Sequence, residues 1–534
     1  MAETRAITGH EGASYDDVPY PSYAFRAAQP DAVALIARLF GVPVAHPSQG
    51  RVLELACASG GHLIPLAARH RQAEHVGIDL SPLQIEEAKR RSKALHLDNI
   101  RWVCADILDL PDDLGTFDTI IAHGVYSWVD TPVQQALLDA CRRLLKPHGV
   151  AYVSYNTHPG WHLHGAVRQF MTWTAEHTPG TAIERVAAAR ARLEWLARSV
   201  PAAHGPYHHM LQRVVSSLAS HNDAYVFHEF LETHNTPVFF TEFHDSARQA
   251  GLQYLGESSL GTMLDHYLPA ETQETLRSMA TNIIELEQYL DILRARTFRQ
   301  TLLVQAEVGV KRDLTQVDLT GLYVCSPARC TSAPLAPDQP GAQTFVDPST
   351  ENPLTLADPG IRNILHFLID SWPERKPLQD VIDHAWQHTH PNGVSWDEDW
   401  CQRARRQLEL GVLSLHALRL VQLCVEDTVS VRDPGQHPEA WHVARYQALS
   451  SHRVTTPSHG TRDLPPLEHH LLAQLDGSRS RARVLTDLAA EDARQKRLTG
   501  MPSQLPTTAA SLDSVLTQLA AWGLLVRSER DATS

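Results

Sequence analysis

The chain has 534 residues, of which 43% are hydrophobic and 20% charged, and its formal net charge is −14. A single hydrophobic core does not serve a chain of this length, so we expect roughly three or four domains of ordinary globular composition. The acidic charge argues against a nucleic-acid substrate, because phosphate contacts need a basic surface. There is no run of about 18 apolar residues, and segment 1–17 is polar. The protein is therefore expected to be cytoplasmic, without membrane insertion.

Seven cysteines are scattered over the chain, at positions 57, 104, 141, 325, 330, 401 and 424. An odd number without a recognisable framework predicts reduced thiols. The 31 histidines include the pairs His162/His164 and His384/His388, whose spacing a metal ion could use. No cysteine or carboxylate constellation accompanies these pairs, so we predict no metal site.

Apolar strands alternate with amphipathic helices between residues 30 and 160. The expected strands are 51–55, 75–79, 101–105, 117–122 and 150–155. Helices are expected at 31–40, at 62–70 and after Ser81, which is placed as an N-cap. This alternation predicts βαβ crossovers and an α/β, doubly wound sheet with a Rossmann-like order.

The pattern changes to helices rich in Ala, Arg and His over 161–235 and then resumes. A helix is expected at 241–250, a strand at 252–257, a helical stretch at about 270–298 and a strand at 301–307. We interpret 161–235 as an insertion between the fifth and sixth strands. The last two strands then complete a seven-stranded sheet.

Two modules of similar layout follow residue 311, each after a Pro-rich linker at about 332–353 or 430–465. Each gives two helices, a further helix, and then a glycine (Gly411 or Gly523) followed by an apolar strand, which suggests a winged-helix-like repeat. Neither third helix carries a sustained basic stripe, so a protein-interaction or scaffold role is favoured over DNA binding. The predicted domains are 1–310, 311–455 and 456–534.

The carboxyl ends of the first three strands carry small or acidic residues. The first strand ends near Glu54 and is followed by the turn 56–61, ACASGG, whose small residues allow a ligand close to the backbone and to a helix N-terminus. Asp79 ends the second strand, where a carboxylate binds both ribose hydroxyls of a nucleoside. Asp106 and Ile107 end the third strand, at the height of an adenine. Together these loops predict a nucleoside pocket.

The residues of the first turn discriminate between two nucleosides. A nicotinamide dinucleotide would also use Asp79, but it requires G-x-G-x-x-G after the first strand, and Glu54 would repel its pyrophosphate. An acidic residue just before a small-residue turn instead suits the amino group of S-adenosylmethionine (SAM). We therefore predict a SAM site.

Several longer motifs resemble a known family. They are E-L-x-C-x-S-G-G at 54–61, G-I-D-L-S-x-x-Q-I at 77–85, H-G-V-Y-S-W-V at 123–129, H-E-F-L-E at 228–232, N-T-P-V-F-F at 235–240 and F-R-Q-T-L-L-V at 298–304, with Tyr155-Asn156-Thr157-x-Pro159-Gly160-Trp161. The chain resembles, over nearly its full length, the bacterial class I SAM-dependent methyltransferases that carry a methyltransferase regulatory domain. Relatives in this family include the rickettsial lysine methyltransferases of outer-membrane protein.

The resemblance implies a seven-stranded SAM-binding core interrupted by a helical dimerisation insert, and hence a homodimer. It implies a SAM site, releasing S-adenosylhomocysteine, formed by Glu54, Ala56, Cys57, Ala58, Ser59, Gly60, Asp79, Leu80, Gln84, Asp106, Ile107 and His123. The chain departs from the family where Ala56 and Ala58 replace the usual Gly-x-Gly, since alanine disfavours positive φ. Segment 25–31 also lacks the Thr-His that usually precedes Pro-Asp, so an N-terminal contact to SAM or substrate is expected to differ.

The loops after the fourth and fifth strands face the methyl group in this fold. We predict that Tyr126 and Asn156 orient the acceptor amine. Trp128 and Trp161 are predicted to form the aromatic wall of a lysine channel through cation–π attraction, with Tyr126 and Tyr155 also lining it. His123 is either a proton acceptor or the partner in a structural hydrogen bond. The competing interpretation is that these aromatic side chains pack under the insert.

The predicted reaction is methylation of an amine, most simply a lysine side chain of a protein or peptide. One alternative is a small natural-product amine or hydroxyl as acceptor. A second is a degenerate SAM-binding regulator, which Ala56 and Ala58 would mark. Nucleic-acid methylation lacks both a basic surface and the D/N-P-P-Y/F signature.

Overall fold

The structure, a computed structural model, describes residues 22–219, 221–265, 268–390, 397–499 and 505–532. The polar segment 1–17 lies outside these ranges. Within them, no helix has both the length and the apolar character needed to cross a membrane. None of the seven cysteines is in a disulfide.

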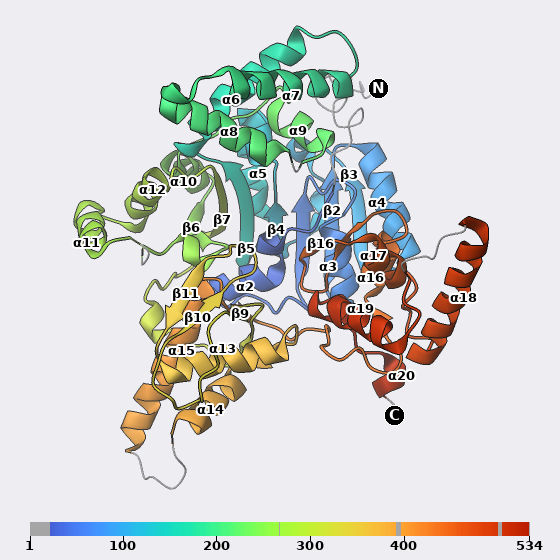
Figure 1. Cartoon of the computed structure of the whole chain (residues 1–534). Coiled ribbons are helices and arrows are strands. Elements are labelled where there is room, and N and C mark those ends of the chain that lie inside the picture. The colour runs from blue at the N-terminus through green and yellow to red at the C-terminus, as the bar shows by residue number, and fades with distance from the viewer. Residues whose placement is uncertain (1–21, 220, 266–267, 391–396, 500–504, 533–534) are drawn as a thin grey trace.

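A seven-stranded sheet organises the first 310 residues (Figure 1). Its strand order is β3-β2-β1-β4-β5-β7-β6, with β7 antiparallel to both of its neighbours and the other pairs parallel. The strands are β1 (Arg51–Leu55), β2 (Glu74–Asp79), β3 (Ile100–Cys104), β4 (Phe117–Ala122), β5 (Leu145–Asn156), β6 (Leu252–Glu257) and β7 (Phe298–Gln305). The chain order reverses between β1 and β4, which is where ligands bind at the carboxyl edge of such sheets. The α/β fold class is confirmed.

Helices flank the sheet close to their expected positions: α2 (Pro30–Leu39), α3 (Leu63–Arg69), α4 (Pro82–Ala94), α5 (Thr131–Leu144) and α10 (Phe240–Gln249). The Ser81 hydroxyl accepts from the Gln84 N–H at 3.2 Å, which confirms the N-cap. The stretch expected at 270–298 divides into α11 (Ala270–Met279) and α12 (Ile283–Arg294). The break occurs because the Asn282 side chain caps α12 by accepting two backbone N–H groups.

The insertion lies between β5 and β6, as predicted, and consists of α6 (Gly160–Glu176), α7 (Ala182–Ser199), α8 (Gly205–Leu218) and α9 (Asp223–Phe230). It has its own small core, which includes Met171, Leu193, Leu211 and Phe230. Because α6 begins four residues after β5 ends, the insert stands directly above the carboxyl edge of the sheet (Figure 1).

The described part of the middle module contains the helices α13 (Pro359–Ser371), α14 (Leu378–Thr389) and α15 (Glu398–Ala417) and a small sheet of order β12-β8-β13. Its strands are β8 (Tyr323–Cys325), β12 (Lys376–Pro377) and β13 (Gln422–Cys424). A second sheet of β9 (Arg329–Cys330), β10 (Gln343–Val346) and β11 (Pro353–Leu356) includes part of the stretch expected as a linker at 332–353. The strand expected directly after Gly411 is wrong, since that glycine lies inside α15. Leu408, Val412 and Leu415 are buried at helical spacing, so this apolar run faces the core as a helix.

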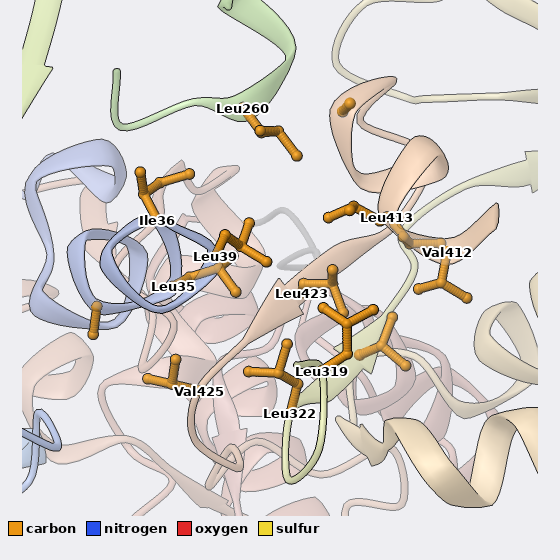
Figure 2. Packing of buried hydrophobic residues seen from close by; sticks show 14 of the residues in the cluster. Leu35, Ile36, Leu39, Leu260, Leu319, Leu322, Val412, Leu413, Leu423 and Val425 are labelled. Atoms are coloured by element: carbon orange, nitrogen blue, oxygen red, sulfur yellow. The ribbon is translucent and has the colours of Figure 1, made fainter. Parts of the chain in front are cut away.

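The middle module shares its core with the methyltransferase domain (Figure 2). Helix α2 supplies Leu35, Ile36 and Leu39. These residues belong to one buried cluster with Leu260 and with the middle-module residues Leu319, Leu322, Val412, Leu413, Leu423 and Val425. The two parts therefore form one continuous hydrophobic core.

The C-terminal module packs against α3 and α4 (Figure 1). Its described helices are α16 (His442–Gln447), α17 (Pro466–Leu472), α18 (Arg481–Thr499), α19 (Ala509–Ala521) and α20 (Glu529–Ala532). Gly523 precedes β17 (Leu525–Val526), as predicted. The stretch expected as a linker over 430–465 contains α16 and a hairpin of β15 (Arg453–Thr455) and β16 (Thr461–Asp463). Ile64, Ala68 and Leu95 of the methyltransferase domain belong to the same buried cluster as this module.

Candidate active site

The turn after β1 has an unusual backbone. Ala56, Ala58 and Gly60 all have positive φ, at 58°, 46° and 76°. The left-handed region costs an L-residue about 1–2 kcal/mol relative to glycine, so the two alanines hold the conformation for which the family uses glycine. Such strain is retained where the surrounding structure over-determines it, commonly at ligand sites.

Asp79 over-determines this turn. Its Oδ2 accepts from the Ala58 N–H at 2.8 Å, and its Oδ1 accepts from the Ser81 N–H at 2.9 Å. The carboxylate therefore joins the loop after β1 to the loop after β2 and lies at the position where a ribose is expected. Its contact with the ribose hydroxyls stays a prediction.

Glu54 is a buried carboxylate without a compensating cation. Its side chain is 4% exposed, and no described residue bonds its Oε2. Burial, and next the nearby Asp79 carboxylate, raise the pKa of Glu54 well above its usual range. A raised pKa of this kind is expected for a buried carboxyl group that has no positively charged partner. The α-ammonium group of SAM would supply one, so the donor set fits this ligand.

Side chains of Arg91 and Trp102 pack tightly against the rest of the turn. Cys57 and Ser59 are buried, and the Ser59 hydroxyl accepts from Arg91 at 3.1 Å. The ring of Trp102 covers Gly60 and Gly77 so closely that a Cβ on either glycine would lie 2.5 or 2.4 Å from it. Trp102 was not among the predicted site residues, although a glycine inside a strand such as Gly77 signals a close neighbour.

The loops predicted to flank the adenine follow β2 and β3. The Asp106 Oδ1 accepts from the Leu108 N–H at 2.9 Å and fixes the loop that contains Ile107. Leu80 and Leu108 present exposed apolar side chains, 41% and 56% accessible, from these two loops. Gln84 is buried in the first turn of α4.

His123 follows β4 and is half-buried. Its Nδ1 lies 2.9 Å from the Tyr152 hydroxyl and 3.3 Å from the Ser154 hydroxyl, and its ring stacks on Phe25 with the centroids 3.7 Å apart. Burial lowers the pKa of His123 to about 3. An imidazole with this pKa is a weak proton acceptor, so the geometry favours the structural hydrogen bond.

Tyr126 and Tyr155 pack beneath α10 and do not form a channel. Tyr126 is 3% exposed and meets Phe243 edge-on at 5.1 Å, and burial raises the pKa of its hydroxyl, which contacts Ser246. Tyr155 stacks on Phe243 at 4.0 Å and bonds Thr301 at 3.1 Å. The predicted role of Tyr126 in orienting the amine therefore finds no support in this geometry. The short helical turn that begins at Tyr126 directs its ring into the core.

Asn156, Trp161 and a residue that was not predicted, Asn235, form a polar cluster at the carboxyl end of β5. The Asn235 Oδ1 lies 3.2 Å from both the Asn156 Nδ2 and the Trp161 Nε1. Trp128 is half-buried on the neighbouring loop. Asn235 belongs to the N-T-P-V-F-F motif, which pointed to the family but not to the site.

The chain's similarity to known proteins agrees with this geometry. Three family models match: "Methyltransferase domain" at 52–149, "Predicted methyltransferase regulatory domain" at 222–305 and "PKMT, C-terminal winged helix domain" at 436–524. Among curated relatives, the uncharacterized protein RP028 of Rickettsia prowazekii is 33% identical over 45% of this chain and 96% of its own length. The uncharacterized protein RP789 of the same organism is 35% identical over 63% of this chain, and the match spans only 60% of RP789.

Two solved structures of PKMT2 from Rickettsia typhi are similar over 95% of this chain and all of theirs. One has a TM-score of 0.84 at 26% identity, and the other, in complex with AdoHcy, has 0.83 at 25%. The chain belongs to the family of class I SAM-dependent methyltransferases that carry a methyltransferase regulatory domain and a C-terminal winged-helix domain. SAM is the methyl donor of this family.

Proposed function

We propose that this protein transfers a methyl group from SAM to the side-chain amine of a lysine in a protein or peptide. The observation that carries the proposal is the match to PKMT2 along 95% of the chain, which includes the insert and both C-terminal modules as well as the SAM-binding core. The net charge of −14 supports a basic protein acceptor and no nucleic-acid partner.

In the proposed SAM site, each polar group around the turn at 56–61 has a role. Glu54 receives the α-ammonium group, and Asp79 receives the ribose hydroxyls while it holds Ala58. Leu80, Leu108 and Asp106 flank the adenine. When bound, SAM supplies an electrophilic methyl group on a sulfonium.

The chain offers positioning more than acid–base chemistry to the acceptor. A lysine must be neutral to react, which costs roughly 4–5 kcal/mol at pH 7 from its usual pKa. His123 is too weak a base to pay that cost, since its pKa is about 3. Desolvation of the amine beside Asn156 and Trp161 lowers the lysine pKa, and the released proton passes to solvent. Orientation of the two reactants supplies the larger part of the acceleration.

The helical insert is proposed as the interface of a homodimer. Five of its large apolar side chains are exposed, Leu163, Trp173, Ile183, Trp195 and Tyr207. Exposed apolar side chains on one helical unit support the proposal of an interaction surface there.

Transfer of tritium from [methyl-³H]SAM to poly-L-lysine, followed by acid hydrolysis and chromatography, tests the function. The expected product is methyl-lysine formed by the wild type and not by an Asp79→Ala variant. Incorporation into a small amine but never into a polypeptide would instead support the small-molecule alternative.

A further inference from the structure

The segment 235–238, Asn-Thr-Pro-Val, crosses both loops that face the acceptor. The Thr236 N–H donates to the Ser127 carbonyl at 2.7 Å, on the loop after β4. The Val238 N–H donates to the Asn156 carbonyl at 3.1 Å, and the His158 N–H returns a bond to Val238 at 3.1 Å. Val238 also pairs with Thr157 as an isolated β-bridge. A segment some 80 residues further along the chain is thus fixed onto the site by backbone bonds.

The hydrogen-bond chemistry determines which way the Asn235 amide points. The Trp161 Nε1 can only donate, so the atom 3.2 Å from it must be the carbonyl oxygen of Asn235. The same oxygen accepts from the Asn156 Nδ2 at 3.2 Å. One acceptor therefore holds the indole of Trp161 and the amide of Asn156 together.

This arrangement determines what Asn156 presents to a substrate. Its Nδ2 is used by Asn235 and its backbone carbonyl by Val238. Asn156 as a whole is 4% exposed, no hydrogen bond from a described residue reaches its side-chain oxygen, and that oxygen is not one of the fully buried atoms that lack a partner. That oxygen remains as an acceptor for the N–H groups of an amine whose lone pair must point toward the methyl group.

We infer that Asn235 is a positioning residue for the acceptor amine: it directs the Asn156 Oδ1 toward the amine and fixes the Trp161 ring beside it. The inference rests on the proposed function, because it assumes an amine acceptor. The Asn235 Nδ2 is itself buried and has no partner among the described residues, so only the carbonyl oxygen of Asn235 acts in this arrangement.

The test compares full-length wild type with Asn235→Ala, Asn235→Asp and, as a matched control, Thr233→Ala, an exposed position on the same stretch. Rates of methyl transfer to poly-L-lysine are measured, with calorimetry for S-adenosylhomocysteine affinity. Asn235→Ala is expected to lower kcat roughly 10- to 100-fold without changing nucleotide affinity. Asn235→Asp keeps an oxygen that accepts both bonds and should restore most of kcat, and Thr233→Ala should match wild type. Equal kcat for Asn235→Ala and wild type, or no rescue by Asn235→Asp, would overturn the inference.

A second readout does not need turnover. In ¹⁵N-tryptophan-labelled protein saturated with S-adenosylhomocysteine, the Trp161 indole resonance, assigned with Trp161→Phe, is followed while n-butylamine is added. It should shift with amine in wild type and Asn235→Asp and stay fixed in Asn235→Ala. An identical response in Asn235→Ala contradicts the inference. A normal indole response without transfer to poly-L-lysine contradicts the proposed function and leaves the positioning role supported.

Discussion

His459 of the C-terminal module lies 2.9 Å from His62, the residue that precedes α3. The Nδ1 of His62 also accepts from the Phe25 N–H at 3.1 Å, so this nitrogen is an acceptor and the Nε2–H of His459 donates to it. The imidazole of His62 therefore joins three parts of the chain: the segment that contains Phe25, helix α3 after the turn at 56–61, and the β15–β16 hairpin. Ser22 reinforces the contact by accepting from the Gly61 N–H at 2.7 Å.

Replacement of His459 should weaken nucleotide binding from outside the methyltransferase domain. His459→Ala removes one buried hydrogen bond, which corresponds to roughly a 2- to 10-fold higher Kd for S-adenosylhomocysteine. Calorimetry measures the change. His452→Ala, an exposed histidine beside the same hairpin, is the control and should bind like wild type. Unchanged affinity in His459→Ala would show that the module is only docked and not coupled to the site.

The free energy of unfolding should decrease as pH falls, because His459 resists protonation in the folded state. Burial lowers the pKa of His459 to about 3, whereas an unfolded histidine titrates near 6.5. The unfolded state thus binds more protons between these values, so the contribution is complete above pH 6.5 and is lost as pH falls toward 3. At pH 5 the loss is about 2 kcal/mol. His459→Asn retains a donor but does not titrate, so its melting temperature should drop less than that of wild type between pH 7.5 and 5. Parallel profiles would refute this assignment.

Substitution of a glycine and of an alanine in the turn at 56–61 should affect stability differently. Gly60→Ala places a Cβ 2.5 Å from Trp102 at a positive φ and should cost about 2 kcal/mol or more in stability. Ala58→Gly relieves left-handed strain but loosens the unfolded chain, so its net effect should stay within about 1 kcal/mol. Thermal unfolding with and without S-adenosylhomocysteine measures both. A Gly60→Ala variant as stable as Ala58→Gly would mean that the Trp102 contact yields easily.

A buried ion pair joins the middle module to the methyltransferase domain. The Asp31 Oδ2 lies 3.1 Å from Arg375, and its Oδ1 accepts from the Val425 N–H at 2.7 Å. Asp31→Asn leaves the Arg375 charge buried without this partner and should destabilise the chain by about 3 kcal/mol. Chemical denaturation measures the change, and the exposed Asp112→Asn serves as control. A loss no larger than that of the control would mean that the pair contributes nothing to interdomain stability.

The proposed homodimer predicts an effect of charge on the insert. The Trp195→Glu variant replaces an indole that is 58% exposed on α7 by an unpaired carboxylate. Light scattering after size-exclusion chromatography should show a dimer for wild type and a monomer for the variant, because burying an isolated carboxylate is costly. A monomeric wild type would contradict the proposed homodimer.

The sheet was predictable because its signals are local. Strands at 51–55, 117–122 and 252–257 have the expected bounds, and Ser81 caps the expected helix. Short apolar strands bounded by caps and small-residue turns carry this information in adjacent residues. The stretch 430–465 was not recognised as structured, since its elements are only two to six residues long among prolines and polar residues.

The site was predictable only where a residue acts at the end of its own strand. Glu54, Asp79 and Asp106 were predicted in this way, and hydrogen bonds from Ala58 and Ala105 to Asp79 join the ends of the three strands. Their contacts with SAM stay predictions. Asn235 and His459 reach the site from elements some 80 and 400 residues away from their partners, and no local pattern encodes such contacts. The orientation of Tyr126 was missed for a related reason: the turn that buries its ring is defined by packing against Phe243.

The most direct test of the central claim is calorimetric titration of the full chain with S-adenosylhomocysteine and SAM, alongside Asp79→Ala and the exposed control Asp98→Ala. Wild type and the control should bind with micromolar affinity. Asp79→Ala should weaken it roughly 10- to 100-fold, since it removes charge-assisted bonds to the ribose and the brace on Ala58. Absence of binding by wild type, or undiminished binding by Asp79→Ala, would contradict the assignment of the turn around Ala56, Ala58 and Gly60 as a SAM site.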